Sequence, residues 1–356
     1  MATPKFLQGS GTFHTDIKSR VNQYFSEVKK TTTGDTSLFI KAIVLFICYI
    51  FIYIHLVFFT PVWWLGILEC ILLGGITSAI GFNVMHDGGH GSFSRYSWLN
   101  KLAGNSLNFL GASALLWNMK HNILHHTYTN VDGVDDDIEV KPMLRLCKTQ
   151  KRYFFHKFQH YYVWFLYTLL HIVWIWGTDF KKYFKREIAH TPLRKWTMRE
   201  HISFWLAKVI YGFIMVAVPI YFVGFTAWLI GFLVMAMVTG FTIAIVFQLA
   251  HTVEDTEFPL PATESGKIEN EWAIHQVVTT ANFATNNKLI SWLVGGLNFQ
   301  IEHHLFPKIS HIHYPAISKI IKQACKEHGI KYNEFTKMSH AIASHYLYMR
   351  KLGQSA

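Results

Sequence analysis

Residues 38–59 of the chain read LFIKAIVLFICYIFIYIHLVFF, an almost unbroken apolar run. A helix of about 20 such residues crosses the hydrocarbon core of a bilayer, so this run predicts a transmembrane helix. Thr60 and Pro61 end the run, and Val62 to Met85 forms a second apolar segment after a short connection without Lys or Arg. The two segments therefore predict a membrane-embedded hairpin over residues 38–85.

A second hairpin is predicted over residues 204–250. Phe204 to Phe225 and Thr226 to Ala250 repeat the apolar pattern, and the turn between them carries no charged residue. The loop between the two hairpins, residues 86–203, is rich in Lys and Arg from residue 141 onward. The positive-inside rule places such a loop in the cytosol.

Both ends of the chain are predicted to share the cytosolic side with this loop, because an even number of spans separates them. The N-terminal segment covers residues 1–37 and the C-terminal region residues 251–356. We therefore expect a single domain over residues 1–356: an all-α integral membrane protein with four transmembrane helices in two hairpins and a cytosolic helical cap. The first residues are polar, so no signal peptide is predicted.

The composition agrees with a membrane protein, since 51% of the residues are hydrophobic and only 15% are Asp, Glu, Lys or Arg, against about 25% in soluble chains. The net charge of +11 would suggest nucleic acid in a soluble protein. Here the basic residues cluster beside apolar segments, which favours an anionic membrane surface or an acidic redox partner, and no nucleic acid is expected. The four cysteines lack CxxC spacing, which argues against a zinc ribbon or disulfide framework.

Seven of the 21 histidines fall in three short windows. The windows are HDGGH at residues 86–90, HNILHH at residues 121–126 and QIEHH at residues 300–304. The first window lies at the cytosolic end of the second apolar segment. Because clustered histidines are typical of metal sites, the three windows together predict a metal centre on the cytosolic side.

The spacing within the windows gives this prediction a geometry. Residues four apart share one face of a helix, so His86 and His90 can face the same metal, as can His121 and His125. His126 is rotated by about 100° from its neighbour, which lets adjacent histidines reach two ions.

The number of histidines also bears on the metal. Imidazole suits zinc, copper, iron and nickel. A zinc site needs only three or four ligands, whereas seven or more clustered histidines fit two ions. A metal transporter or metal-sensing protein is the alternative from a different class, but its ligands should lie within the bilayer rather than at the ends of the spans.

Two further segments raise the question of additional spans. Leu99 to Trp117 is moderately apolar, and Tyr161 to Trp176 is strongly apolar but short. If exactly one of them crossed the membrane, the histidine windows would lie on opposite sides and could not meet. We therefore predict that both lie in the cytosolic leaflet as interfacial or re-entrant helices.

In their order and rough separation, the three windows resemble the histidine boxes of the membrane fatty acid desaturase and hydroxylase superfamily, over about Phe39 to Pro315. The leading Gln of QIEHHLFP is similar to the front-end desaturases, and HNILHHTYTN to bacterial linoleoyl-CoA desaturase-like members. The resemblance implies two iron ions held mainly by histidine, at His86, His90, His121, His125, His126, His303 and His304.

The resemblance also implies a further ligand shortly after the fourth span. His251 in QLAHTVED is the first candidate and His275 the second. Gln300 stands where other members have histidine, and it either binds iron directly or holds a ligand or a water molecule.

The activity that the resemblance implies is that of a fatty-acyl desaturase, which uses O2 as co-substrate and two electrons to form a cis double bond in an acyl-CoA or acyl-lipid. Hydroxylation of an alkane, sterol, carotenoid or sphingolipid at the same centre is the alternative. Many front-end desaturases carry a fused cytochrome b5 domain with a His-Pro-Gly-Gly motif, which is absent here. We expect a separate donor, ferredoxin or cytochrome b5, and an active site facing the cytosol at a bacterial inner membrane.

Acidic and amide residues near these windows are harder to interpret. Glu69 lies inside the second predicted span, and a structural hydrogen bond is expected for it. Residues 135–137, three consecutive Asp, are interpreted as a solvated loop. Other such groups can orient metal-binding imidazoles, and the candidates are Asp87, Asn122, Asn130 and Asp255.

Overall fold

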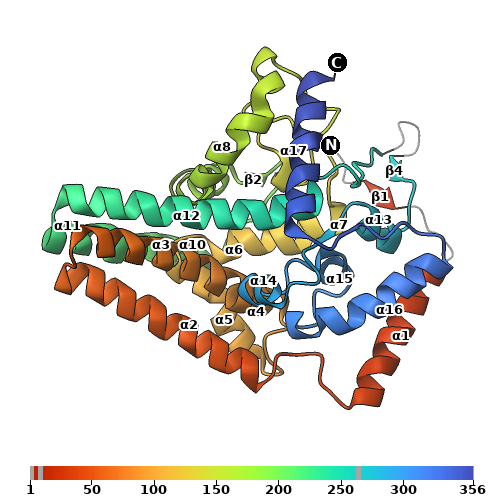
Figure 1. Cartoon of the computed structure of the whole chain (residues 1–356), viewed down its shortest axis with the longest axis horizontal. Helices are drawn as coiled ribbons and strands as arrows, with labels where there is room; N and C mark the ends of the chain where they lie inside the picture. The colour runs from red at the N-terminus through yellow and green to blue at the C-terminus, as the bar shows by residue number, and fades with distance from the viewer. Residues whose placement is uncertain (1–3, 7–10, 262–265, 356) are drawn as a thin grey trace.

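The computed structural model describes residues 4–6, 11–261 and 266–355, and helices make up most of it (Figure 1). The cytosolic segments expected at residues 1–37 and 251–356 lie partly outside the described residues. The helices form an elongated bundle with a cap at one end.

The first predicted hairpin is present as two long helices. They consist of α2 (Thr36–Ile54) with the π-helical turn η1 (His55–Phe59), and of α3 (Trp63–Ile80) with the π-helical turn η2 (Gly81–Met85) and α4 (His86–His90). Asp35 caps α2, because its carboxylate accepts hydrogen bonds from the backbone amides of Ser37 and Leu38 at 2.9 and 3.3 Å. The cap satisfies amides that have no partner within the helix and so fixes where the first apolar helix begins.

The second hairpin packs against the first. It consists of α10 (Met198–Gly212), η7 (Phe213–Ala217), α11 (Val218–Val223) and α12 (Phe225–His251). A Cβ on Gly74 of α3 would lie 2.6 Å from the Met235 carbonyl oxygen, and Thr239 donates a hydrogen bond to the Gly74 carbonyl at 3.1 Å. Small residues let helices approach closely in a membrane, so α2, α3 and α12 run side by side across Figure 1.

Within the described residues, five helical stretches are long and apolar enough to cross a membrane, judged by length and composition. They are Thr36–Phe59, Trp63–His90, Phe154–Lys185, Met198–Val223 and Phe225–His251. Four of them are the hairpin helices. The remaining stretch contains the ambiguous segment from Tyr161 to Trp176 but is much longer, since it combines η5 (Phe154–Phe158), α8 (Gln159–Val173), η6 (Trp174–Thr178) and α9 (Asp179–Lys185).

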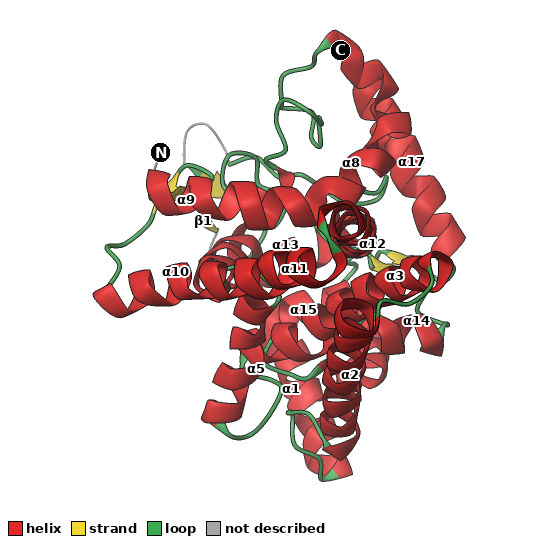
Figure 2. Ribbon diagram, turned by 90° about the vertical axis from the view of Figure 1, so that its left-hand side faces the viewer, coloured by secondary structure: helices red, strands yellow, loops and turns green. Residues whose placement is uncertain are grey.

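This long stretch crosses the bundle instead of running along it. In Figure 1, α8 runs up the page while α2, α3 and α12 run across it, and Figure 2 views α12 end-on. The crossing point is Gly240 of α12, where an added Cβ would lie 2.6 Å from the Thr168 carbonyl oxygen and 3.0 Å from that of Tyr167. Glycine therefore permits a crossing at backbone contact.

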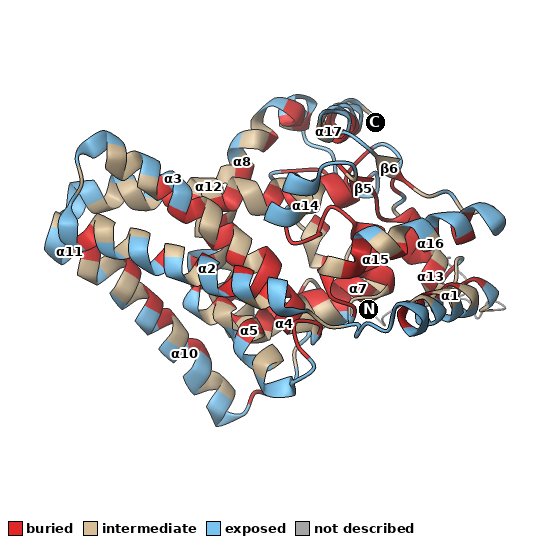
Figure 3. Ribbon diagram, turned by 60° about the horizontal axis from the view of Figure 1, so that its bottom comes forward, coloured by how far each residue is buried: buried red, intermediate tan, exposed pale blue. Residues whose placement is uncertain are grey.

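Shorter helices build the cap. The loop between the hairpins contributes α5 (Ser97–Phe109), α6 (Ala114–Trp117), the π-helix η3 (Asn118–His125), α7 (His126–Tyr128) and η4 (Asp136–Ile138). The C-terminal region contributes α13 (Trp272–Val278), α14 (Lys288–Leu293), α15 (Gln300–Leu305), η8 (His311–His313), α16 (Tyr314–Glu327) and α17 (Met338–Gln354). In Figure 3, buried residues concentrate around α7, α13 and α15, whereas exposed residues mark the outer face of α2.

The N-terminal helix and short strands close the cap. α1 (Thr12–Val28) packs on α16 and buries Phe13, Ile17 and Val21. Among the described residues, three strand pairs join loops: β1 (Lys5–Phe6) with β4 (Lys267–Ile268) in parallel, β2 (Glu187–Ile188) with β3 (Thr191–Pro192) antiparallel, and β5 (Asn282–Phe283) with β6 (Glu334–Phe335) in parallel.

Glu69 makes the structural hydrogen bond expected for it. Its Oε1 lies 2.8 Å from Nδ1 of His55 on the facing helix of the first hairpin. A carboxylate inside an apolar helix is costly unless it is paired, and this contact provides the partner. That prediction is confirmed.

Candidate metal centre

The histidines of the three windows come from separate parts of the fold. α4 presents the first window where the long helix of α3 ends, and the π-helix η3 with α7 carries the second. α15 in the cap carries His303 and His304, and His251 is the last residue of α12. Both hairpins and the cap therefore contribute to one site.

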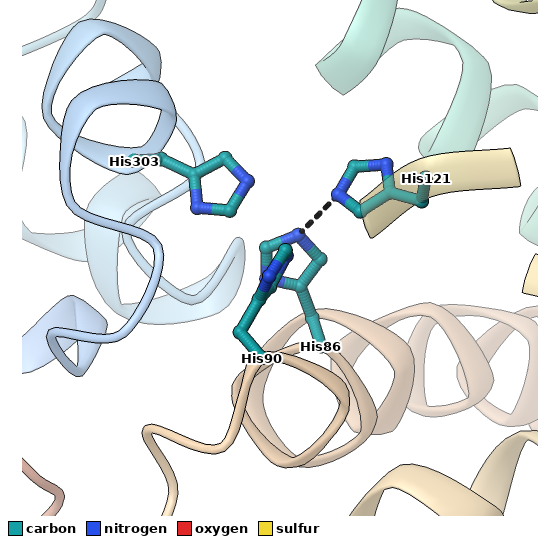
Figure 4. Close-up of side chains that lie close together, drawn as sticks. All are labelled: His86, His90, His121 and His303. Atoms are coloured by element: carbon teal, nitrogen blue, oxygen red, sulfur yellow. Dashed lines mark hydrogen bonds between the residues drawn. The ribbon is translucent and has the colours of Figure 1, made fainter. Parts of the chain in front are cut away.

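Within the described residues, ring nitrogens of these histidines gather into groups whose potential ligand atoms all lie within 4.8 Å of one another. One group, drawn in Figure 4, is His86, His90, His121 and His303, and another is His125, His251 and His304. His126 joins His303 and His304 in an overlapping set. Eight histidines thus outline two adjacent sites with His126 between them.

The unused ring nitrogens fit bound metal. In the part of the chain that the structure describes, Nε2 is buried without a hydrogen-bond partner in His90, His125, His251, His303 and His304. Such an atom costs about 1–3 kcal/mol when it stays unpaired, and a metal ion in each group would take these nitrogens as ligands. The donors of these three groups are all imidazole, which suits iron among other transition metals, and a further group adds a carboxylate, Asp137, beside His121 and His125.

Electrostatics keeps several of these rings neutral. Burial, reinforced by the neighbouring histidines, holds the pKa of His121, His126, His303 and His304 well below the ordinary value for histidine. Metal binding requires the neutral ring. These side chains are therefore in the protonation state that a ligand needs.

The two glycines of HDGGH permit close packing around the first group. A Cβ on Gly88 would lie 2.4 Å from the Gly104 amide nitrogen, and one on Gly89 would lie 2.3 Å from Cζ3 of Trp117. Trp117 in turn stacks on His121, with ring centroids 4.6 Å apart. The small residues of the first window therefore make room for the indole that positions a ring of the second.

Partners on Nδ1 fix three more rings. Tyr314 Oη lies 3.1 Å from His303 Nδ1, and Gln276 Oε1 lies 2.8 Å from His304 Nδ1. Nδ1 of His125 lies 3.0 Å from a carboxylate oxygen of Asp135. Such contacts set the tautomer and leave Nε2 for a metal. The sequence reasoning missed these partners, because all three lie outside the histidine windows and only the fold brings them to the rings.

The prediction of a solvated loop at residues 135–137 is wrong. Asp135 is fully buried against His125, and Asp137 pairs with Lys120 at 2.5 Å. Burial alone would raise the pKa of Asp137, but Lys120 and His125 hold it below its ordinary value. Asp136 pairs with Lys182 of α9 at 2.5 Å. Three consecutive carboxylates resemble a surface loop in sequence, and only the fold reveals the cations and the imidazole that face them.

The less certain candidates differ in their surroundings. Among the described residues, His275 belongs to none of the histidine groups, and it packs edge-on against Phe6 with centroids 5.2 Å apart. Gln300 is buried, and neither atom of its side-chain amide has a hydrogen-bond partner in the described part of the chain. Gln300 therefore has free polar atoms one helical turn from His303.

Three of the four candidate orienting residues hold backbone near the centre. Asp87 accepts a hydrogen bond from the His311 backbone amide at 3.4 Å, besides one from the Ser310 hydroxyl at 2.6 Å. Asn122 donates to the Gly89 carbonyl at 2.8 Å, and Asn130 donates to the carbonyl of His251 at 3.0 Å. Asp255 instead pairs with Lys331 on the surface at 2.6 Å.

Comparison with known proteins decides the family. Residues 61–336 match the sequence model of the fatty acid desaturases. The chain belongs to the fatty acid desaturase family. As a desaturase it is an oxidoreductase that acts on fatty-acyl chains.

Curated relatives resemble the desaturase over nearly its whole length. It is 36% identical to the sn-1 linoleoyl-lipid 6-desaturase of Synechocystis sp., over 99% of this chain and 98% of that protein. It is 34% identical to the protein of the same name in Arthrospira platensis, over 96% of this chain and 92% of that protein. The acyl-lipid (8-3)-desaturase of Physcomitrium patens is 34% identical over 96% of this chain and 72% of its own length.

A cavity of about 460 Å³ opens beside the histidines of the desaturase, with His121, His125 and His251 in its wall. Part of its lining is charged, and the exposed Lys181 and Lys185 mark the open side. The rest is apolar, from Leu166, Leu170, Val173, Ile243 and Phe247. The cavity beside the histidines therefore has a charged part and an apolar part in its lining.

A second cavity, of about 40 Å³, adjoins the first. The two share Trp117, Trp174, Ile243 and Phe247, and the second also touches His86. No exposed residue lines this cavity. Most of its remaining wall is apolar, including Leu107, Leu110, Ala112 and Ile175, and the polar members are the buried Thr77, His171 and Thr239. The second cavity is thus the closed end of a passage that runs past both histidine groups.

Proposed function

We propose that the protein is an acyl-lipid desaturase whose two iron ions are held by His86, His90, His121, His125, His126, His251, His303 and His304. The observation that carries the proposal is the passage itself: a charged mouth, two histidine groups in its wall and an apolar closed end. Such a passage fits a long hydrocarbon chain with a polar head. The proposed ligand set includes His251, and His275 is not among the ligands.

The chemistry divides between cofactor and protein. Bound iron would supply the oxidation. In the overall reaction O2 takes two electrons from the donor protein, two protons from solution and two hydrogens from adjacent methylenes. The products are two water molecules and a cis double bond. The side chains hold the chain and the imidazoles. Trp117 and Phe247 narrow the passage between the two cavities, and Asp135, Gln276 and Tyr314 orient the rings through Nδ1.

The names of the relatives refine the substrate. Two of them act on a linoleoyl-lipid at the sn-1 position, so we infer a chain esterified to a lipid in preference to an acyl-CoA. The electrons come from a separate donor, ferredoxin or cytochrome b5, at the cytosolic face. A bacterial inner membrane is the proposed location.

We propose four membrane spans and an in-plane stretch from Phe154 to Lys185. The crossing at Gly240 and the orientation of α8 support this arrangement. So does connectivity: if this stretch spanned, the second hairpin would enter from the opposite side, and His251 would end far from His86. Single cysteines at the exposed Lys101 and Lys181 should label from the cytosol, and one at Thr226 from the other side. Labelling of Lys101 and Lys181 from opposite sides would contradict four spans.

The activity is tested in a host of defined lipid composition. New fatty acids with two hydrogens fewer, located by mass spectrometry on the lipid-bound chain, indicate desaturation, whereas gain of one oxygen indicates hydroxylation. His303→Ala should abolish the product and lower bound iron. His340→Ala, an exposed histidine on α17, is the matched control and should leave both unchanged. Full desaturation by the His303→Ala variant would overturn the ligand assignment.

A further inference from the structure

Lys208 is a buried cation that the metal centre does not use. It lies on α10 within an apolar stretch and is 5% exposed. Its ammonium donates hydrogen bonds to the carbonyl oxygens of Gly111 and Ile175, at 2.7 and 2.9 Å, and to Asp179 Oδ2 at 2.7 Å. All three of its protons therefore have acceptors.

Asp179 adds two hydrogen bonds to the segments that Lys208 already contacts. Its Oδ2 also accepts a hydrogen bond from the Ser113 backbone amide at 2.8 Å, and Oδ1 accepts one from Trp174 Nε1 at 3.2 Å. The ion pair thus joins three pieces of chain: the turn at residues 110–113, the stretch from residue 174 to residue 179, and α10.

Stability alone does not explain this pair. Removing two charges from water costs several kcal/mol per ion, and well-packed apolar residues often serve a fold as well or better. Ionisable side chains within apolar membrane segments usually have a functional reason. Neither Lys208 nor Asp179 belongs to the histidine groups found among the described residues, so that reason must lie elsewhere.

The pair sits behind the closed end of the passage. The wall of the second cavity includes Leu110, Ala112, Trp174 and Ile175. Lys208 binds the backbone carbonyl of Gly111, which lies between two of these residues in sequence, and the carbonyl of Ile175 itself. Gly111 has φ +96°, and a Cβ there would lie 2.8 Å from Ile175 Cδ1 and from the Tyr211 ring. The turn is therefore pressed against its neighbours, and the ion pair fixes where the passage ends.

We infer that the Lys208–Asp179 pair is a positioning device that sets how deep an acyl chain inserts and so which chain lengths the enzyme accepts. This inference rests on the proposed desaturase function. A chain that is too long for a fixed closed end must fold or withdraw, which moves its reacting carbons away from the histidine groups. In an apolar pocket, one methylene of misfit changes the specificity about 10- to 200-fold.

The test replaces both charges at once, because removing Lys208 alone would leave a buried carboxylate unpaired. The variant Lys208→Met with Asp179→Asn keeps an amide for Ser113 and removes the ion pair. Its matched control is Lys331→Met with Asp255→Asn, the same substitutions in an exposed pair. Each protein receives a mixture of linoleoyl-lipid and the lipid whose chain is two methylenes longer.

The buried double variant should turn over the longer chain about tenfold better relative to linoleoyl, the low end of the cost of one methylene, with unchanged iron per protein. The surface control should show the same ratio of longer-chain to linoleoyl turnover as the protein without substitutions. If the double variant does not fold, Lys208→Gln with Asp179→Asn, which also removes both charges but keeps an amide to donate to the Gly111 and Ile175 carbonyls, should show a smaller rise. An unchanged ratio in whichever variant folds would overturn the inference. Desaturation by His303→Ala would instead overturn the proposed function, so the two failures are distinguishable.

Discussion

Each hairpin carries one buried lysine near the start of its first helix, and the two lysines have different partners. Lys41 of α2 donates to the side-chain oxygen of Asn83 and to the Trp292 carbonyl, and lies 4.2 Å from the centre of the Trp292 ring. Lys208 of α10 has a carboxylate, Asp179, besides its two carbonyls. One lysine is held by neutral groups alone, and the other belongs to an ion pair.

The partners place the two lysines in different parts of the site. Asn83 lies in the π-helical turn that leads to His86, and it also donates to the Leu293 carbonyl at 3.0 Å. Lys41 therefore ties the first histidine window to the cap segment that precedes the third. Lys208 ties down the closed end of the passage. Hairpins that look alike in sequence thus place one lysine beside the first histidine window and the other behind the second cavity.

The largest effect is expected on the metal side, from Asp135→Asn. An amide carries no charge and has one acceptor oxygen in place of the two that Asp135 uses, so it holds Nδ1 of His125 less firmly. Loss of such a partner lowers metal affinity or activity about 10- to 100-fold. Iron per protein and turnover, measured on the same preparation, check this. The ratio of longer to shorter chains should stay unchanged, and a changed ratio would break the division between metal and chain sides.

Lys41→Met should act in the same direction but more weakly, because it reaches His86 only through Asn83. We expect iron content and turnover to fall about tenfold, the low end for residues that orient ligands, for both chain lengths alike. Titration of the purified protein with ferrous iron gives the affinity. A shift in chain-length ratio without loss of iron would show that the two lysines are equivalent.

Gly111→Ala sharpens the comparison by reversing the expected direction. A side chain at φ +96° is strained by about 1–2 kcal/mol, and its Cβ would push Ile175 and Tyr211, so the closed end should move into the passage. The longer chain should then be used less well relative to linoleoyl, with iron unchanged. The same competition assay measures it, and a rise in the ratio would contradict the role given to this turn.

The smallest effect is expected at the surface. Lys331 and Asp255 form a close but exposed pair, and such pairs contribute about 0–1 kcal/mol. Replacing both with Met and Asn should leave the midpoint of thermal unfolding, the iron content and the chain ratio nearly unchanged. A large change in any of these three quantities would mean that the effects of removing the buried pair do not depend on its burial.

Features coded in short stretches of sequence were predictable. The apolar runs at residues 38–59 and 204–250 have the length of membrane helices, and the structure has helices there. The histidine windows are local as well, because spacing of four residues puts side chains on one face whatever the rest of the fold does. That the windows meet was the premise from which the placement of the two ambiguous segments was predicted, and the structure does bring the windows together.

Features that depend on distant residues were not predictable. The length and crossing direction of the stretch from residue 154 to residue 185 depend on contact with Gly240 of another helix. The sequence ranked His251 ahead of His275, because His251 directly follows the fourth apolar run, but it could not show what either ring faces. Only the fold puts His251 beside His125 and His304. The buried role of Asp135 was hidden for the same reason.

The third histidine window lies late in the chain, and this position decides when the histidine groups can be completed during synthesis. His303 belongs to one histidine group and His304 to the other, and both lie on α15, which the ribosome produces after the two hairpins. Until α15 docks, each histidine group lacks one of its members. A nascent or prematurely terminated chain can therefore form both hairpins and still complete neither histidine group.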